Sequence, residues 1–191
     1  MNINHVMMFL VPIIVIVSIL YSYSTLYTGI TGMATSQVGN LTVGVTTYIS
    51  CVWSDAALDV SFGTNLDPGT NDISATNNSV GDENNTLYNV TVDVFSNVNG
   101  NITIKGANLV SGANTISVGN VTWASNTTDA NGTNMVAGNS IALTTSYDTA
   151  NPIAADEPIG STVWYRFWLD IPSGTISGNY VGNYTMQCQQ A

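Results

Sequence analysis

Basic residues are almost missing from this chain, which has one lysine, one arginine and one histidine among its 191 residues. With 12 acidic residues, the formal net charge is −10 at pH 7. Such a chain repels the phosphates of nucleic acids, and two basic side chains offer no phosphate clamp. The composition therefore excludes nucleic acid as a partner.

The shortage of histidine also argues against catalysis. His5 precedes the apolar N-terminal run, so the rest of the chain has no imidazole to act as a base or as a zinc ligand. Neither a Ser-His-Asp nor a Cys-His arrangement is possible there. The carboxylate pairs Asp55/Asp59 and Asp82/Glu83 have the surroundings of turn and loop acids. We therefore expect that the protein is not an enzyme and has no cofactor.

Calcium is the one metal for which suitable ligands are present. Asp67, Asp72, Asp82 and Glu83 lie in a stretch rich in asparagine, and calcium prefers such hard oxygen ligands. Their spacing does not match an EF-hand loop. The sequence leaves calcium open and predicts no other metal.

The N-terminal segment is an almost unbroken apolar run from Val6 to Leu20, with no lysine or arginine before or within it. Continued to about Ile30, it would form a helix of roughly 38 Å at 1.5 Å per residue. That length spans a bilayer, whose hydrocarbon core is about 30 Å thick. Pro12 would kink this helix by removing one backbone donor. We expect a membrane anchor or the core of an assembly.

Two interpretations of this helix stay open. Its tyrosines alternate with serine and threonine beyond Leu20, as in an aromatic belt at a membrane interface. The same small hydroxyl residues would also let helices pack closely together. The residues expected in a packed helical core are Met7, Phe9, Val11, Ile13, Ile14, Ile16, Val17, Leu20, Tyr21, Tyr23 and Tyr27.

The start of the mature chain is also open. A signal peptidase could cut near Ala34, although a dozen polar and aromatic residues separate that site from Leu20. Alternatively, a short charged leader has already been removed and Met1 is not the initiator. A cut near Ala34 would remove the apolar segment from the exported product, whereas a product that begins at or near Met1 would keep it.

The segment MMFLVPIIVIVSILYSYSTLYTGITG has an apolar first half, a second half with spaced serines and tyrosines, and a glycine exit. In this it resembles the N-terminal helix of archaeal type IV pilins and archaellin-like filament subunits. The resemblance implies a filament core made of such helices, with β-sandwich heads outside and the helix held in the membrane before assembly. The acidic residue common near the start of bacterial pilins is absent.

The remaining chain is rich in Asn, Thr and Gly and contains eight or nine short segments with alternating polarity, separated by turn residues. This pattern predicts an antiparallel, immunoglobulin-like β-sandwich. The expected fold class is therefore α+β. Residues 1–36 would form the hydrophobic helix, and residues 37–191 would form one extracellular head.

In the segments where polarity alternates most regularly, the alternation predicts which side chains face the core and which face solvent. In LYNVTVDVF, we expect Tyr88, Val90, Val92 and Val94 to face the core. In NITIK, the core residues would be Ile102 and Ile104, with Asn101, Thr103 and Lys105 in water.

Two cysteines, Cys51 and Cys188, lie in an early segment and in the last one. An even number in an exported domain predicts a disulfide, which would close nearly the whole head into one loop. Both have core-facing parity, and Trp53 shares the face of Cys51. The alternative is a pair of buried free thiols.

Nine Asn-x-Ser/Thr triplets predict N-linked glycans on an exported protein. A composition so rich in Asn and Thr also produces several such triplets by chance. The candidates are Asn40, Asn77, Asn84, Asn89, Asn101, Asn120, Asn126, Asn131 and Asn183.

The segment VWYRFWLDI places Trp164, Arg166 and Trp168 on the face opposite its apolar side chains. In one interpretation these residues form an exposed contact surface, because Trp and Arg are enriched at binding hot spots. The alternative is that the domain itself covers both faces of this strand.

Three functions follow as expectations. The first is a structural subunit of an extracellular, type IV pilus-like filament of identical subunits, serving adhesion or attachment at the cell surface. The second is a membrane-anchored or secreted cell-surface binding module. In the third, a segment such as GNLTVGVTTYIS completes the sheet of a neighbouring copy.

Overall fold

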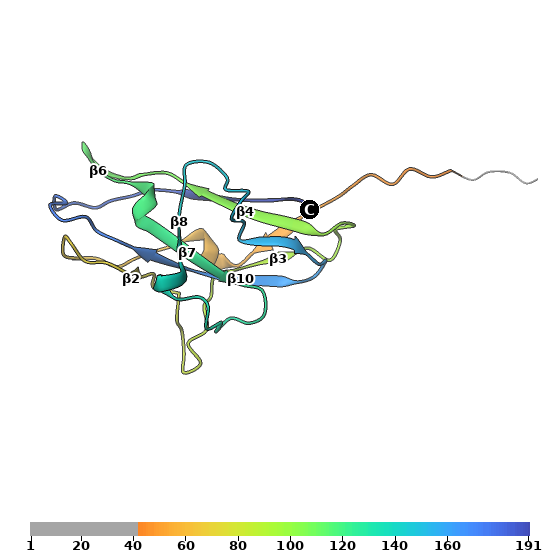
Figure 1. Ribbon diagram of the computed structural model, residues 1–191, viewed down its shortest axis with the longest axis horizontal. Coiled ribbons are helices and arrows are strands. Elements are labelled where there is room, and N and C mark those ends of the chain that lie inside the picture. Colours follow the sequence, from red (N-terminus) through yellow and green to blue (C-terminus); the bar gives the residue numbers. More distant parts are fainter. Residues whose placement is uncertain (1–41) are drawn as a thin grey trace, which may run out of the picture. The chain divides into compact units, whose positions relative to one another are not determined.

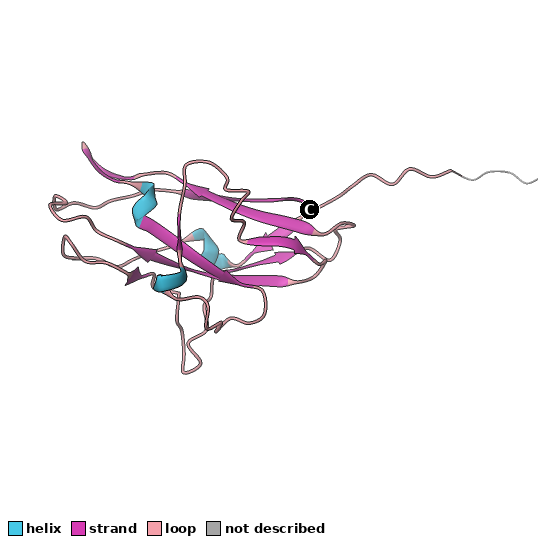
Figure 2. Cartoon of the chain, viewed as in Figure 1, coloured by secondary structure: helices cyan, strands magenta, loops and turns pink. Residues whose placement is uncertain are grey.

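A computed structural model describes residues 42–191, which contain short strands linked by turns and loops (Figures 1 and 2). The strands of the first half are β1 (Cys51–Trp53), β2 (Ile73–Ser74), β3 (Asn89–Val92), β4 (Gly100–Gly106), β5 (Leu109–Ser111) and β6 (Asn114–Ile116). Those of the second half are β7 (Val121–Asn126), β8 (Ile141–Ala142), β9 (Ala154–Glu157), β10 (Thr162–Leu169) and β11 (Tyr184–Gln190). Three 3₁₀ helices lie between them, η1 (Asp55–Leu58), η2 (Val118–Asn120) and η3 (Ala137–Asn139).

The strands form two main sheets and a hairpin, and every pairing is antiparallel. The larger sheet has the order β1-β3-β10-β7-β8, with β2 also paired to β10. The smaller sheet has the order β11-β4-β9, and β5 pairs with β6. Residues from Val45 onward form one compact unit.

The expected α+β class is wrong for the residues that the structure describes. This part of the chain is mainly β, and its helices are 3₁₀ turns of three or four residues. The antiparallel sheets of the prediction are confirmed. The predicted helix over residues 1–36 lies outside the described residues.

The core lies between the two main sheets, because inward side chains of both belong to one apolar cluster. Val90, Val163 and Tyr165 from the larger sheet are fully buried, as are Ile102 and Ile104 from β4. These residues sit at alternate positions of their strands, as a two-layer structure requires. The face assignment of β4 is therefore correct for its apolar residues. Thr103, expected in water, is also buried.

A buried asparagine fills a gap along the central strand β10. On one side, β10 pairs with β3 at its start and with β2 at its end. Between them, the Asn78 amide nitrogen donates to the Phe167 carbonyl, and its oxygen accepts the Phe167 N–H at 2.9 Å. The Asn78 side chain thus takes the place of a paired residue, and no backbone polar group of Phe167 stays unsatisfied.

Three of the segments with alternating polarity form no strand or a shorter strand than the pattern predicts. Residues 42–50 have no regular pairing, so the first strand begins only at Cys51. The segment from Leu58 to Gly63 forms no strand either. β3 stops at Val92 because the Asp93 carboxylate accepts the Phe95 N–H at 3.0 Å and forms a turn. Val94, expected in the core, is therefore exposed.

Two phenylalanines give a matched test of this core. Phe167 is 1% exposed between the sheets, whereas Phe95 is 81% exposed in the turn after β3. Phe167→Ala should lower the free energy of unfolding by about 3–5 kcal/mol, because it removes buried apolar surface and leaves a cavity. Phe95→Ala should change it by less than about 0.5 kcal/mol. Urea unfolding measures both, and equal losses would contradict this core.

Candidate functional site

The disulfide between Cys51 and Cys188 is confirmed. It joins β1 of the larger sheet to β11 of the smaller one, with 137 residues between the cysteines and Cα atoms 6.1 Å apart. Trp53 lies two residues from Cys51, and its Nε1–H donates to the Met186 sulfur at 3.0 Å. All four residues pack against the core or link to it. The bridge thus ties an edge strand of each sheet together.

Beside the disulfide, a group of aromatic rings fills the space between the sheets. Tyr88 stacks on Tyr165 with ring centroids 6.0 Å apart, and Phe167 lies 5.2 Å from Tyr184. The Tyr184 hydroxyl donates to the Ala57 carbonyl in η1. Burial raises the pKa of Tyr88 and of Tyr165, and it raises the pKa of Tyr184 to about 12. The neutral phenol is thus the form that the folded state favours.

The proposed contact surface on β10 is covered rather than exposed. Arg166 and Trp168 are buried, and Trp164 is partly buried. Trp168 packs with Met135 in a second small apolar cluster. Of the two interpretations of this strand, the burial of Arg166 and Trp168 supports the one in which the domain itself covers both faces.

Loop backbone explains why the single arginine is buried. Its guanidinium Nη1 donates to the Met135 carbonyl at 3.1 Å, and Nη2 donates to the Asn84 carbonyl at 2.5 Å. Arg166 thereby fastens two loops over the outer face of β10. Desolvation lowers the pKa of this guanidinium from its ordinary value. The role of the side chain here is to hold loops in place.

The sequons differ in how freely their asparagines are presented. Those in full contact with solvent are Asn84, Asn131 and Asn183, and partly buried ones are Asn77, Asn89, Asn101, Asn120 and Asn126. Two of the partly buried amides are engaged through their oxygens, which accept backbone N–H groups. Asn40 lies outside the described residues. Glycans on the folded head would attach most readily to the three exposed asparagines.

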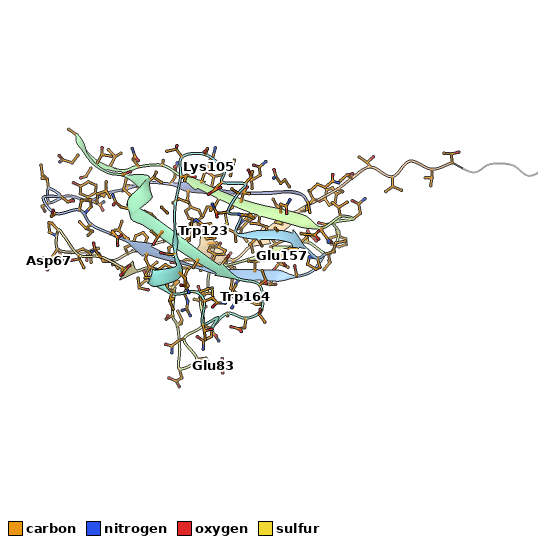
Figure 3. All side chains as sticks on the ribbon, in the orientation of Figure 1. Asp67, Glu83, Lys105, Trp123, Glu157 and Trp164 are labelled. Atoms are coloured by element: carbon orange, nitrogen blue, oxygen red, sulfur yellow. A yellow bond between two sulfur atoms is a disulfide. The ribbon has the colours of Figure 1, made fainter. Side chains whose placement is uncertain are left out.

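The acids considered for calcium do not come together. Asp67 and Glu83 lie at the tips of different loops (Figure 3). The Glu83 carboxylate accepts from the Asn85 side chain at 2.9 Å, and the Asp72 N–H donates to Asp170 at 2.8 Å. Over residues 42–191, no group of three or more His, Cys, Asp or Glu is placed to hold a metal ion.

The eleven residues expected in a helical core, from Met7 to Tyr27, lie outside the described residues. In the part of the chain from residue 42 onward, no helix has the length and apolar character needed to cross a bilayer.

β11 is an edge strand, which the sequence pattern did not predict. It pairs with β4 over seven consecutive residues, from Tyr184 opposite Gly106 to Gln190 opposite Gly100. On its other side, no strand of the described chain pairs with it. Alternating polarity identifies a strand but not its neighbours, so pairing order could not be derived from the sequence.

Hydrogen bonds at the two ends of β11 show which of its backbone groups face outward. The Ala107 N–H donates to the Asn183 carbonyl, and the Ala191 N–H donates to the Asn99 carbonyl, in each case between directly opposed residues. Hydrogen-bonded pairs alternate with non-bonded ones in an antiparallel ladder. The backbone groups that face away from β4 therefore belong to Tyr184, Met186, Cys188 and Gln190.

Comparisons with known proteins give no relative. No protein-family model, no curated protein and no solved structure matches the chain. The proposals below therefore depend on the sequence and the structure alone.

The disulfide should supply a large part of the head's stability. The variant Cys51→Ala/Cys188→Ala should unfold with a free energy about 2–5 kcal/mol lower, because its unfolded chain regains the freedom of a long loop. Urea unfolding measures the loss. A reducing agent should lower the midpoint of the parent protein and leave the double variant unchanged. Equal urea midpoints for the double variant and the parent protein under oxidising conditions would contradict this role.

Alkaline pH should destabilise the head. Because burial raises the phenol pKa values above their ordinary value of about 10, the folded state holds these protons more tightly than the unfolded state. The stabilisation is complete below about pH 10 and is lost as the pH rises through about 12 for Tyr184. Urea midpoints measured between about pH 8 and 11 should fall at the upper end. Tyr165→Phe should weaken this fall in the urea midpoint, whereas the control Tyr48→Phe, at an exposed position, should not. Equal effects of the two substitutions would contradict a role of the buried phenols in the pH dependence.

Proposed function

We propose that this protein is a structural subunit of an extracellular filament, assembled from identical copies and serving attachment at the cell surface. Two parts of the chain would have separate roles. The apolar N-terminal segments of the copies would pack together in the filament core, and the β-rich heads would form its outer surface. The observation that carries the proposal is the coupling of an almost unbroken apolar run, Val6 to Leu20, to a head closed by a disulfide.

The head has the properties of an exported domain. Its disulfide links the two sheets, and structural disulfides persist mainly in oxidising compartments and outside the cell. Charged residues make up only 7% of the chain, and the exposed sequons offer sites for glycans. A disulfide-closed head without reliance on surface ion pairs suits a protein that must keep its fold in the external medium.

The apolar segment favours assembly over a solitary anchor. No lysine or arginine flanks it, although such residues normally fix the orientation of a membrane segment. Tyrosines and hydroxyl residues follow its apolar half, and small polar residues let apolar segments pack closely. We therefore favour a filament, in which copies bury these segments against one another, over a membrane-anchored binding module.

Electron microscopy of the full chain, exported by a host cell and sheared from its surface, tests the proposal. The parent chain should form filaments. Ile14→Asp/Ile16→Asp should abolish them, because each aspartate places a charge where apolar segments must pack. The control Ile14→Val/Ile16→Val keeps the segment apolar and should still assemble. Parent protein that stays single and bound to membranes would overturn the filament proposal and support the anchored module.

A further inference from the structure

β11 differs from the other sheet edges in having no feature that discourages pairing. Natural edge strands are commonly protected by charge, proline, bulges or short length. β9, at the far edge of the smaller sheet, has an irregular register, carries Asp156 and Glu157, and is followed by Pro158. In the larger sheet, the edge strands β1 and β8 have only three and two residues.

β11, in contrast, is long, regular and uncharged. Its sequence YTMQCQQ keeps continuous register with β4 over seven residues, with no proline and no ionisable carboxylate or amine side chain. The side chains of Thr185, Gln187 and Gln190 are exposed. Its outward backbone groups, at Tyr184, Met186, Cys188 and Gln190, are free to take a further strand. The disulfide at Cys188 holds this edge in place.

The same chain carries an extended segment without a partner. Residues 42–48, TVGVTTY, alternate in polarity with Val43 and Val45 on one face, as strands do. Val45 is 77% exposed, and among the described residues none pairs with the backbone of residues 42–45. A sequence with strong strand character is thus left unpaired over residues 42–45, whereas Thr46 and Tyr48 are bonded to Asn97.

The last residues of this segment, Thr46 to Tyr48, lie near the end of β11. The Tyr48 N–H donates to the Asn97 side chain at 2.8 Å, and Asn97 in turn donates to the Thr46 carbonyl. Two residues further, the Asn99 carbonyl accepts the N–H of Ala191, the residue that follows β11 (Figure 1). The end of the extended segment and the end of β11 thus lie close together at one end of the head. There the segment of one copy can pair with β11 of the next.

Both elements also lack the features that would keep two copies apart. The whole chain has a net charge of −10, so copies repel one another over most of their surface. No charged side chain occurs from Leu41 to Trp53 or from Tyr184 to Gln190. None of the nine sequon asparagines lies in either stretch. A contact between these two elements avoids charge, and the sequon asparagines nearest to it are Asn40 and Asn183, each immediately before one of the two stretches.

We propose that the extended segment at residues 42–48 of one copy adds as a strand to the outer edge of β11 in a second copy. The added strand would satisfy the outward N–H and C=O groups of β11 and bury Val45. This inference deepens the proposed function, because it names the head-to-head contact of the filament. The neighbour's donor segment would extend the smaller sheet from three strands to four.

Hydrogen exchange followed by mass spectrometry tests the contact in the full chain, without any substitution. In the single chain, the amides of Met186, Cys188 and Gln190 should exchange fast, whereas those of Thr185, Gln187 and Gln189 are protected by β4. In the assembled protein, the first set and the amides of residues 42–45 should exchange about tenfold more slowly or more. Assemblies in which the outward amides still exchange fast would overturn the inference.

A substitution at one position gives an independent test. Gln190→Pro removes an outward N–H and leaves the ladder with β4 intact, because the bonds to β4 come from the alternate residues. It should raise the protein concentration needed for assembly by about tenfold or more, since the ring also blocks the incoming backbone. Gln190→Ala keeps the N–H and should assemble like the parent. Equal assembly of both variants would overturn the inference.

The two proposals fail in distinguishable ways. If filaments form and neither the exchange of β11 nor the proline variant responds, the filament proposal stands and strand addition is wrong. If the chain never assembles, both are wrong. If the outward amides become protected only when a different protein is added, the acceptor edge is real but the second copy is not its occupant, and the inference is overturned.

Discussion

The disulfide between Cys51 and Cys188 is the constraint on which the rest of the head depends. It joins the first strand of the larger sheet to the last strand of the smaller one, so the two layers are fixed at the side where both have an edge. The apolar cluster between the layers then fills with alternate side chains of β3, β4 and β10. Because the bridge lies within β11, the seven-residue edge is held straight against β4 rather than left to fray.

Where the sequence predicted the head well, one local rule decided the structure. Alternation placed Val90, Ile102 and Phe167 in the core, and the parity of two cysteines predicted their bridge. The failures came from contacts that local patterns do not contain. Val94 is exposed because the Asp93 side chain accepts the Phe95 N–H and ends the strand before it. The strand β9, with the sequence AADE, has little strand character and forms because β4 offers it a partner.

The candidate site shows the same division. Sequence patterning found the face of β10 that carries Trp164, Arg166 and Trp168, but only the structure shows that loops cover it and that the guanidinium binds their carbonyls. Conversely, residues 42–48 have the alternation of a strand and form none in the single chain. A strand requires both a suitable sequence and a partner. The unpaired segment and the unpaired edge of β11 each have one half of that requirement, and a second copy would supply the other.

The most direct test of this account is a high-resolution electron microscopy structure of the assembled full chain. The account predicts a filament in which residues 42–48 of each copy lie as a fourth strand beside β11 of its neighbour, with the Cys51–Cys188 bridge intact. A filament in which β11 faces solvent or glycan would contradict the strand contact. Exported protein that stays monomeric would contradict the central claim, that this chain is a filament subunit.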